Sequence, residues 1–188
     1  MRKIIFYLSI AISSSGFSQT GTIIRPYIVD DVCITTEEYK LYELVMKYRK
    51  KYKLPNIPLS KALSHVAKVH CEDMEINLKE LSHAWSTCEY NNSNQKTYYC
   101  MWDKPKELTS YNATGYEIAH GGVGGYVASA ESSLNGWQHS KPHNNVILNK
   151  DIWKEDKWNA IGIGIYGGFA TIWFGKEEDK DGEPNVCK

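Results

Sequence analysis

The segment NAIGIGIYGGFATIWFG, residues 159–175, decides the fold class of this 188-residue chain. Isoleucine alternates with glycine over residues 161–165, which is the period-two pattern of a β-strand. Gly167-Gly168 then turns the chain into a second apolar run over residues 169–174, so the segment predicts a β-hairpin. Because glycine alone occupies one face of the first strand, another element can pack closely on that face.

Two amphipathic helices are predicted upstream of the hairpin. The first begins at Thr35, where Glu38 completes a capping box, and its apolar positions follow helical spacing: Leu41, Leu44, Val45, Tyr48 and Tyr52. The second begins near Ser60, with an apolar stripe formed by Leu63, Val66, Ala67, His70, Cys71 and Met74. We interpret His70 as a core or cleft-edge histidine and expect His65 to be solvated.

The middle of the chain, from about Leu81 to Gly125, is rich in Gly, Asn, Ser and Tyr and is predicted to be irregular. A third helix is expected over residues 128–137, broken near Pro142, with a further turn over residues 144–148. Helices followed by a hairpin predict an α+β domain, in which helices cover an antiparallel sheet. A parallel nucleotide-binding sheet is disfavoured.

The first eighteen residues have a basic start, an apolar run and small residues before Gln19. This pattern predicts a signal peptide at residues 1–18, and the apolar run is shorter than the roughly 20 residues that span a bilayer. We therefore expect residues 19–188 to form one exported, monomeric domain, periplasmic or extracellular, without a transmembrane segment. The net charge of 0 and the lack of a basic run disfavour nucleic acid as a partner.

Five cysteines in an exported chain favour disulfide bonds. Cys88 and Cys100 bracket a polar loop that a disulfide would hold together. Cys33 and Cys187 lie near opposite ends of the chain, and termini often meet in compact domains. We predict both pairs and interpret Cys71 as a buried thiol on a helix.

His139 and His143 have the i, i+4 spacing of a helical metal-binding pair. However, residue 140 is Ser where an HExxH motif has Glu, and Pro142 between the histidines disfavours one continuous helix. The metalloprotease interpretation therefore fails, and we expect His143 but not His139 to face a site.

Four segments, in order over roughly residues 36–175, resemble the CAP superfamily of cysteine-rich secretory, antigen 5 and pathogenesis-related 1 proteins, also called SCP domains. WQHSKPHNNVIL, residues 137–148, resembles the W-x-x-S-x-x-H-x-N-I-L signature of its bacterial members. LSH at 81–83, GYEIA at 115–119 and the final hairpin are similar to its first cleft-histidine motif, its G-E-N-[IL]-A motif and its last strands.

The resemblance implies a three-layer α-β-α sandwich with a central antiparallel sheet and a large cleft lined by two histidines and two acids. Carried over by position, the histidines are His83 and His143, and the acids are Glu117 and Glu131. In the members that bind a metal, the histidines hold Zn²⁺ or another divalent cation. With only two protein ligands, such an ion would be held weakly here.

The chain departs from the family pattern in two places. An ungapped alignment puts Tyr116 at the family's Glu, so Glu117 takes the acidic role only if the backbone shifts by one residue. Lys141-Pro142 also replaces the common Pro-Gly before the histidine. We interpret Trp137 as a core anchor and Ser140 as a helix cap, because no nucleophile elbow surrounds the serine.

Three functions remain open at this stage. The first is a secreted binding module for a lipid, another small ligand, or an envelope or host component. The second is a metal-assisted, peptidase-like hydrolase that uses His83, His143 and Glu117 or Glu131, although no third metal ligand is evident. The third is a structural envelope protein without a ligand. We favour the binding module and leave enzymatic activity undecided.

Overall fold

The computed structural model describes residues 25–188, so the predicted signal peptide at residues 1–18 lies outside the described residues. An antiparallel sheet of order β2-β4-β3 lies at its centre, formed by β2 (Gly115–Gly121), β3 (Ala160–Tyr166) and β4 (Phe169–Gly175). The hairpin predicted from the sequence is confirmed, because β3 and β4 pair from Tyr166↔Phe169 outward.

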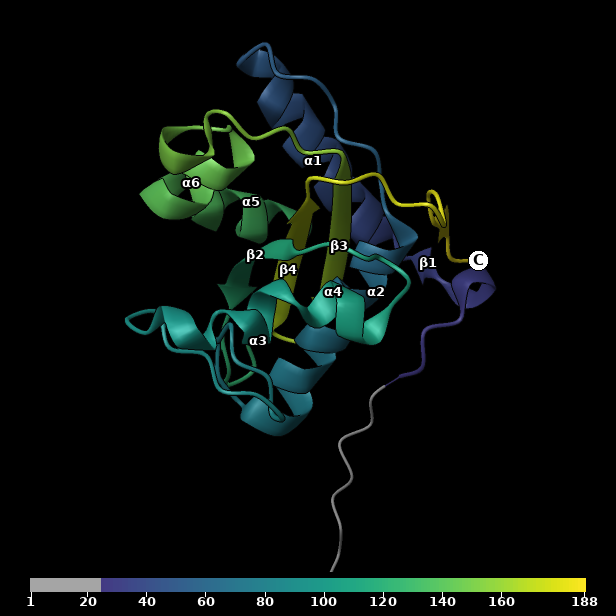
Figure 1. Ribbon diagram of the computed structural model, residues 1–188, viewed down its shortest axis with the longest axis vertical. Coiled ribbons are helices and arrows are strands. Elements are labelled where there is room, and N and C mark those ends of the chain that lie inside the picture. The colour runs from purple at the N-terminus through teal and green to yellow at the C-terminus, as the bar shows by residue number, and fades with distance from the viewer. Residues whose placement is uncertain (1–24) are drawn as a thin grey trace, which may run out of the picture.

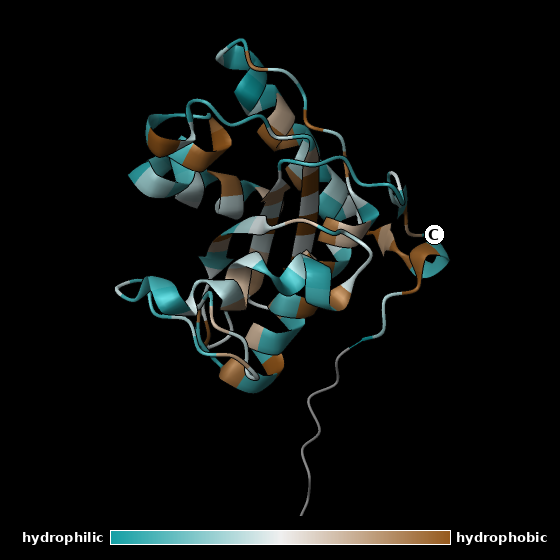
Figure 2. Ribbon diagram, viewed as in Figure 1, coloured by the Kyte–Doolittle hydropathy of each residue, from teal (hydrophilic) through white to brown (hydrophobic). Residues whose placement is uncertain are grey.

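Helices cover both faces of this sheet (Figure 1). On one face, α2 (Lys61–Asp73) packs against β3 and β4. On the other face, α1 (Thr36–Lys51) and α5 (Ala130–His139) share an apolar core with all three strands. The result is the α-β-α arrangement that the resemblance to the CAP superfamily implies. Figure 2 shows hydrophobic residues along β3 and β4, and helices that carry both hydrophilic and hydrophobic residues.

Shorter elements complete the described chain. The remaining helices are η1 (Val29–Asp31), the π-helix η2 (Met74–Leu78), η3 (Gln95–Thr97), α3 (Tyr99–Trp102), α4 (Lys104–Leu108), α6 (Lys141–Ile147) and η4 (Asp151–Trp153). Near the two termini, β1 (Cys33–Ile34) pairs in parallel with β5 (Asn185–Val186). The middle of the chain is therefore less irregular than predicted, since it contains α3, α4 and β2. Within residues 25–188, no helix is both long and apolar enough to cross a membrane.

The glycine face of β3 is the surface on which α2 packs. A Cβ at Gly162 would lie 2.0 Å from the carbonyl carbon of Leu63, and one at Gly164 would lie 2.3 Å from that of Ala67. Both neighbours are backbone atoms of α2, so they cannot rotate away as a side chain could. The alternation of isoleucine and glycine therefore fixes the distance between the helix and the sheet.

The helix boundaries follow local capping chemistry. Thr35 and Glu38 form the predicted capping box of α1, and the Ser60 hydroxyl accepts a hydrogen bond from the Leu63 amide at the start of α2. The break that we predicted near Pro142 lies at Ser140, where α5 ends and α6 begins. Pro142 lies in the first turn of α6, where the missing N–H has no cost.

The cysteines are arranged as predicted. Disulfides join Cys33 to Cys187 and Cys88 to Cys100, which agrees with export to an oxidising compartment. Cys71 is a free thiol buried on α2, and its S–H points to the Gly164 carbonyl oxygen 3.4 Å away. Burial raises the pKa of this thiol far above its ordinary value, so Cys71 acts as an apolar core residue.

The prediction that His65 is solvated was wrong. Its side chain is buried, because the segment before β1 folds over this part of α2 and places the Tyr27 ring 5.2 Å from the imidazole. That segment is held by an ion pair between Arg25 and Glu72 and by a hydrogen bond from Tyr27 to Asp181. Helical periodicity identifies which face looks away from the sheet, but it does not reveal a segment that covers this face.

Candidate functional site

A buried carboxylate on β2 lies at the centre of the candidate site. Glu117 accepts a hydrogen bond from His70 Nδ1 at 2.5 Å through Oε1, and one from His83 Nδ1 at 2.7 Å through Oε2. The side chain of Glu117 is inaccessible to solvent. The three residues of this cluster thus come from three segments: Glu117 from the sheet, His70 from α2, and His83 from the chain after η2.

The pairing of β2 with β4 shows which face of the sheet carries Glu117. β2 pairs with β4 without interruption, with Tyr116 opposite Phe174 and Glu117 opposite Trp173. Glu117 reaches the histidines from the α2 face, while Tyr116 packs against the core on the opposite face. The strand escaped prediction because a glutamate on a buried face breaks the apolar pattern, and only the tertiary partner His70 makes that burial possible.

His70 is a core histidine, as interpreted from the sequence, but its partners could not be foreseen. The ring is fully buried on α2 and stacks on Trp85, with ring centroids 4.3 Å apart and planes 16° from parallel. Its Nε2 lies 2.9 Å from the Ala84 carbonyl oxygen. Both ring nitrogens are therefore used, and His70 ties α2 to β2 and to the segment that carries His83.

Mutual attraction holds this pair in its charged form. Burial alone would raise the pKa of Glu117, but the charges of His70 and His83 and their hydrogen bonds lower it to about 2. Burial likewise opposes a charge on His70, but the Glu117 carboxylate and the Ala84 carbonyl raise the pKa of His70 above its ordinary value. Clusters of titratable groups with perturbed pKa values are typical of functional sites.

His83 is the member of the cluster that reaches solvent, with 28% of its side chain exposed. It borders a pocket of about 350 Å³ lined by Leu81, Ser82, Glu89, Tyr90, Asn91 and Asn92. The Tyr90 ring packs against His83 at 5.4 Å and stacks on Tyr98 at 5.3 Å. The disulfide between Cys88 and Cys100 holds the loop that carries these two tyrosines.

His143 lies in the first turn of α6 and is partly buried. Burial lowers its pKa, and the charges of His83 and His120 lower it further. His120, for which no role was predicted, lies on β2 and shares a 2.9 Å hydrogen bond with the Tyr126 hydroxyl. Its ring packs against Gly136, where a Cβ would lie 2.6 Å from His120 Nδ1.

The residues that precede His143 anchor its helix. Trp137 is buried and donates a hydrogen bond from Nε1 to the Ala119 carbonyl, which fastens α5 to β2. Ser140 occupies the N-cap position of α6, although its hydroxyl makes no capping bond and only its carbonyl accepts from the Asn144 amide. His139 is exposed at the end of α5, where its Nδ1–H donates to the Asn135 carbonyl.

The structure does not bring Glu131 to the histidines that it was predicted to join. Its exposed carboxylate forms an ion pair with Lys40 of α1 at 2.6 Å. Glu131 lies in the first turn of α5, which packs against α1, and the side chain extends to that neighbour. Within residues 25–188, no three His, Cys, Asp or Glu side chains converge as around a metal ion.

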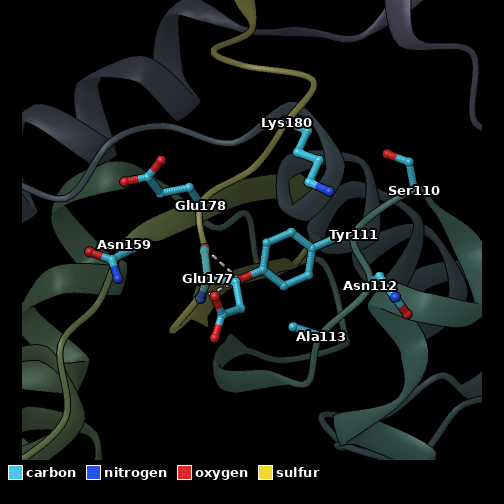
Figure 3. Close-up of a pocket in the computed structure, with 8 residues that line it drawn as sticks. All are labelled: Ser110, Tyr111, Asn112, Ala113, Asn159, Glu177, Glu178 and Lys180. Atoms are coloured by element: carbon cyan, nitrogen blue, oxygen red, sulfur yellow. Dashed lines mark hydrogen bonds between the residues drawn. The ribbon is translucent and has the colours of Figure 1, made fainter.

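A second pocket, of about 650 Å³, contains none of the predicted site residues (Figure 3). Tyr111 spans it, and its hydroxyl donates to the Glu177 carbonyl and accepts from the Glu177 amide. These bonds tie the loop before β2 to the chain after β4. Its lining residues form no cluster comparable to the Glu117 cluster, so we place the candidate site at the histidines.

The histidine cluster lies within the part of the chain that matches a known protein family. The sequence model of the cysteine-rich secretory protein family, CAP, matches residues 42–168, which include His83, Glu117 and His143. The chain belongs to the CAP family. No curated protein matches it significantly in sequence.

Solved structures show the same fold at low sequence identity. An extracellular protein of Bacillus anthracis that contains an SCP domain matches with a TM-score of 0.57 and 20% identity over 75% of this chain and 40% of its own length. An outer surface protein of Borrelia burgdorferi matches with a TM-score of 0.54 and 19% identity, over 77% of this chain and 96% of its own. This CAP chain therefore spans less than half of the Bacillus protein.

Proposed function

We propose that this CAP protein is an exported binding module whose site is formed by His83, Glu117 and His143. The observation that carries the proposal is the hydrogen bond from His83 Nδ1 to the buried Glu117 carboxylate. This bond commits one ring nitrogen and leaves Nε2, on a partly exposed ring beside a pocket, as the nitrogen that can receive a ligand. The N-terminal pattern and the two disulfides support export.

The ligand that these residues fit is a weakly held divalent cation, Zn²⁺ being the one that imidazole suits best, with a small polar molecule completing its coordination. A neutral imidazole whose other nitrogen donates to a carboxylate is a usual zinc ligand. The lowered pKa of His143 keeps its ring neutral and able to bind metal. Because only two imidazoles are available, the site suits reversible binding better than a resident catalytic zinc, and this favours the binding module over the hydrolase.

Calorimetric titration of the purified protein with Zn²⁺ tests this proposal. We expect one weak site, and at least a tenfold loss of affinity in the His83→Ala/His143→Ala double variant, because both ligands are removed. His139→Ala is the matched control, since this histidine is exposed and lies on a different helix from His143. Equal affinity in the double variant and the unmodified protein would overturn the proposal.

A further inference from the structure

The loop between Cys88 and Cys100 carries hydrogen-bond donors that the fold leaves unused. Asn91 Oδ1 accepts from the Ser93 amide, and Asn92 Oδ1 accepts from the Ser93 hydroxyl. Both asparagines are exposed, and within residues 25–188 their Nδ2 groups donate to no acceptor. Each side-chain oxygen therefore helps to hold its amide in place, while the N–H bonds of the same amide are available to a ligand.

The pocket of about 350 Å³ that Asn91 and Asn92 line also offers acceptors. Glu89 lines it too, and its exposed carboxylate has no ion-pair partner or hydrogen-bond donor among residues 25–188. The Ser82 hydroxyl accepts from the Ala84 amide and keeps its own hydrogen for another acceptor. In the described part of the chain, no lysine or arginine lines this pocket, which disfavours an anionic ligand. Unused donors and acceptors in one pocket suit a ligand rich in hydroxyl groups, because a hydroxyl both donates and accepts.

A row of aromatic side chains begins at this pocket. Tyr90 lines the pocket, Tyr98 stacks on Tyr90 with ring centroids 5.3 Å apart, and Trp102 packs edge-to-face against Tyr98 at 5.2 Å. Both tyrosines are partly exposed, and Trp102 is 36% exposed. The face of an aromatic ring is negative, so it attracts the C–H groups on the apolar face of a sugar ring. Exposed apolar groups gathered in one place are typical of interaction sites.

We propose that this pocket binds one sugar unit of a neutral glycan and that the aromatic row supports the units beside it. Hydroxyl groups of the sugar exchange hydrogen bonds with the Asn92 amide and the Glu89 carboxylate, and its C–H groups pack on the Tyr90 ring. The disulfide between Cys88 and Cys100 holds the loop that supplies all three side chains, so little ordering has to accompany binding. This inference rests on the proposed function in that it names a ligand for the binding module, but it requires no metal ion.

A proline-rich peptide is another ligand that packs on aromatic side chains. Its backbone carbonyls accept hydrogen bonds, but proline has no N–H to donate. Such a peptide satisfies the asparagine amides and leaves the Glu89 carboxylate without a partner, whereas sugar hydroxyls serve both. The mixture of unused donors and acceptors therefore favours the glycan.

Calorimetric titration of the purified protein with cellohexaose and with chitohexaose, each in the presence of EDTA, tests the inference without a metal. Both probes are chains of β-linked pyranose units, and only chitohexaose carries N-acetyl groups. We expect at least one of them to bind, and Tyr90→Ala to lower its affinity about tenfold, because aromatic contact surface is lost. Tyr166→Ala is the matched control, since Tyr166 is an exposed tyrosine of β3 that does not line this pocket.

Asn92→Ala is a second test that preserves the loop, because the backbone carbonyl of Asn92 still accepts from the Tyr98 hydroxyl. We expect an affinity about fivefold lower, the usual effect of one lost hydrogen bond, and no change in Asn135→Ala, whose asparagine is exposed on α5. Binding of neither glycan, unchanged affinity in both Tyr90→Ala and Asn92→Ala, or binding of an oligoproline peptide alone would overturn the inference. Glycan binding in EDTA by a protein that binds no zinc would support the inference, while the metal site of the proposed function would fail.

Discussion

Replacing Glu117 with glutamine is expected to lower the free energy of unfolding by about 3–5 kcal/mol, the usual cost of removing one partner from a buried ion pair. The variant leaves the buried His70 ring without its counter-charge and turns an amide toward two N–H donors. Urea denaturation measures the loss. Glu131→Gln is the matched control, because that carboxylate is exposed and paired only with Lys40, and we expect no measurable change. A stability loss in Glu117→Gln no larger than in this control would contradict the buried pair.

The same pair predicts how stability depends on pH. The pKa of Glu117 is lowered from 4.5 to about 2, so its contribution is present above pH 4.5 and is lost as the pH falls toward 2. The pKa of His70 is raised above 6.5, so its contribution is present below pH 6.5 and is lost as the pH rises through the raised value. Urea midpoints across the acid range should fall steeply below pH 4.5 in the unmodified protein and less steeply in Glu117→Gln. If the urea midpoints of the two proteins changed with pH in the same way, Glu117 would not be the source of the loss of stability in acid.

Gly162→Ala is expected to destabilise the domain by about 3 kcal/mol, at the upper end of the cost of overpacking. The added Cβ would lie 2.0 Å from the Leu63 carbonyl carbon, so α2 must move away from the sheet as a whole. Because α2 carries His70, the shift should also disturb the contact with Glu117.

Thermal and urea denaturation measure this effect. Gly122→Ala is the control, because a Cβ there would meet no atom within 4 Å and no positive φ restricts that position. We expect its stability to match that of the unmodified protein. Equal stability of Gly162→Ala and Gly122→Ala would show that the close packing of α2 on β3 does not require glycine at position 162.

Of the two acids named from the sequence, Glu117 lies against His83 and Glu131 does not. His83, Glu117 and His143 were assigned from segments that resemble CAP motifs, and the structure places His83 and Glu117 in direct contact. Glu131 was carried over by position from the family resemblance, and it instead pairs with Lys40. Sequence spacing gives a position along a helix, whereas the direction of a long exposed side chain depends on which helix lies beside it.

By itself, the sequence determined the features that depend on neighbours along the chain. Alternating apolar residues and a glycine turn predicted the hairpin. Capping residues predicted the start of α1 at Thr35 and of α2 at Ser60. The proline between His139 and His143 predicted that the two histidines do not share one helix. The two disulfides were also inferred from chain position and compartment.

Only the tertiary structure decided which polar side chains are buried. Glu117 is acceptable on a core face because His70 and His83 donate to it from 47 and 34 residues away, and His65 is buried because an N-terminal segment folds over it. A buried charge depends on partners that the fold assembles, so neither its burial nor its protonation can be read from local pattern.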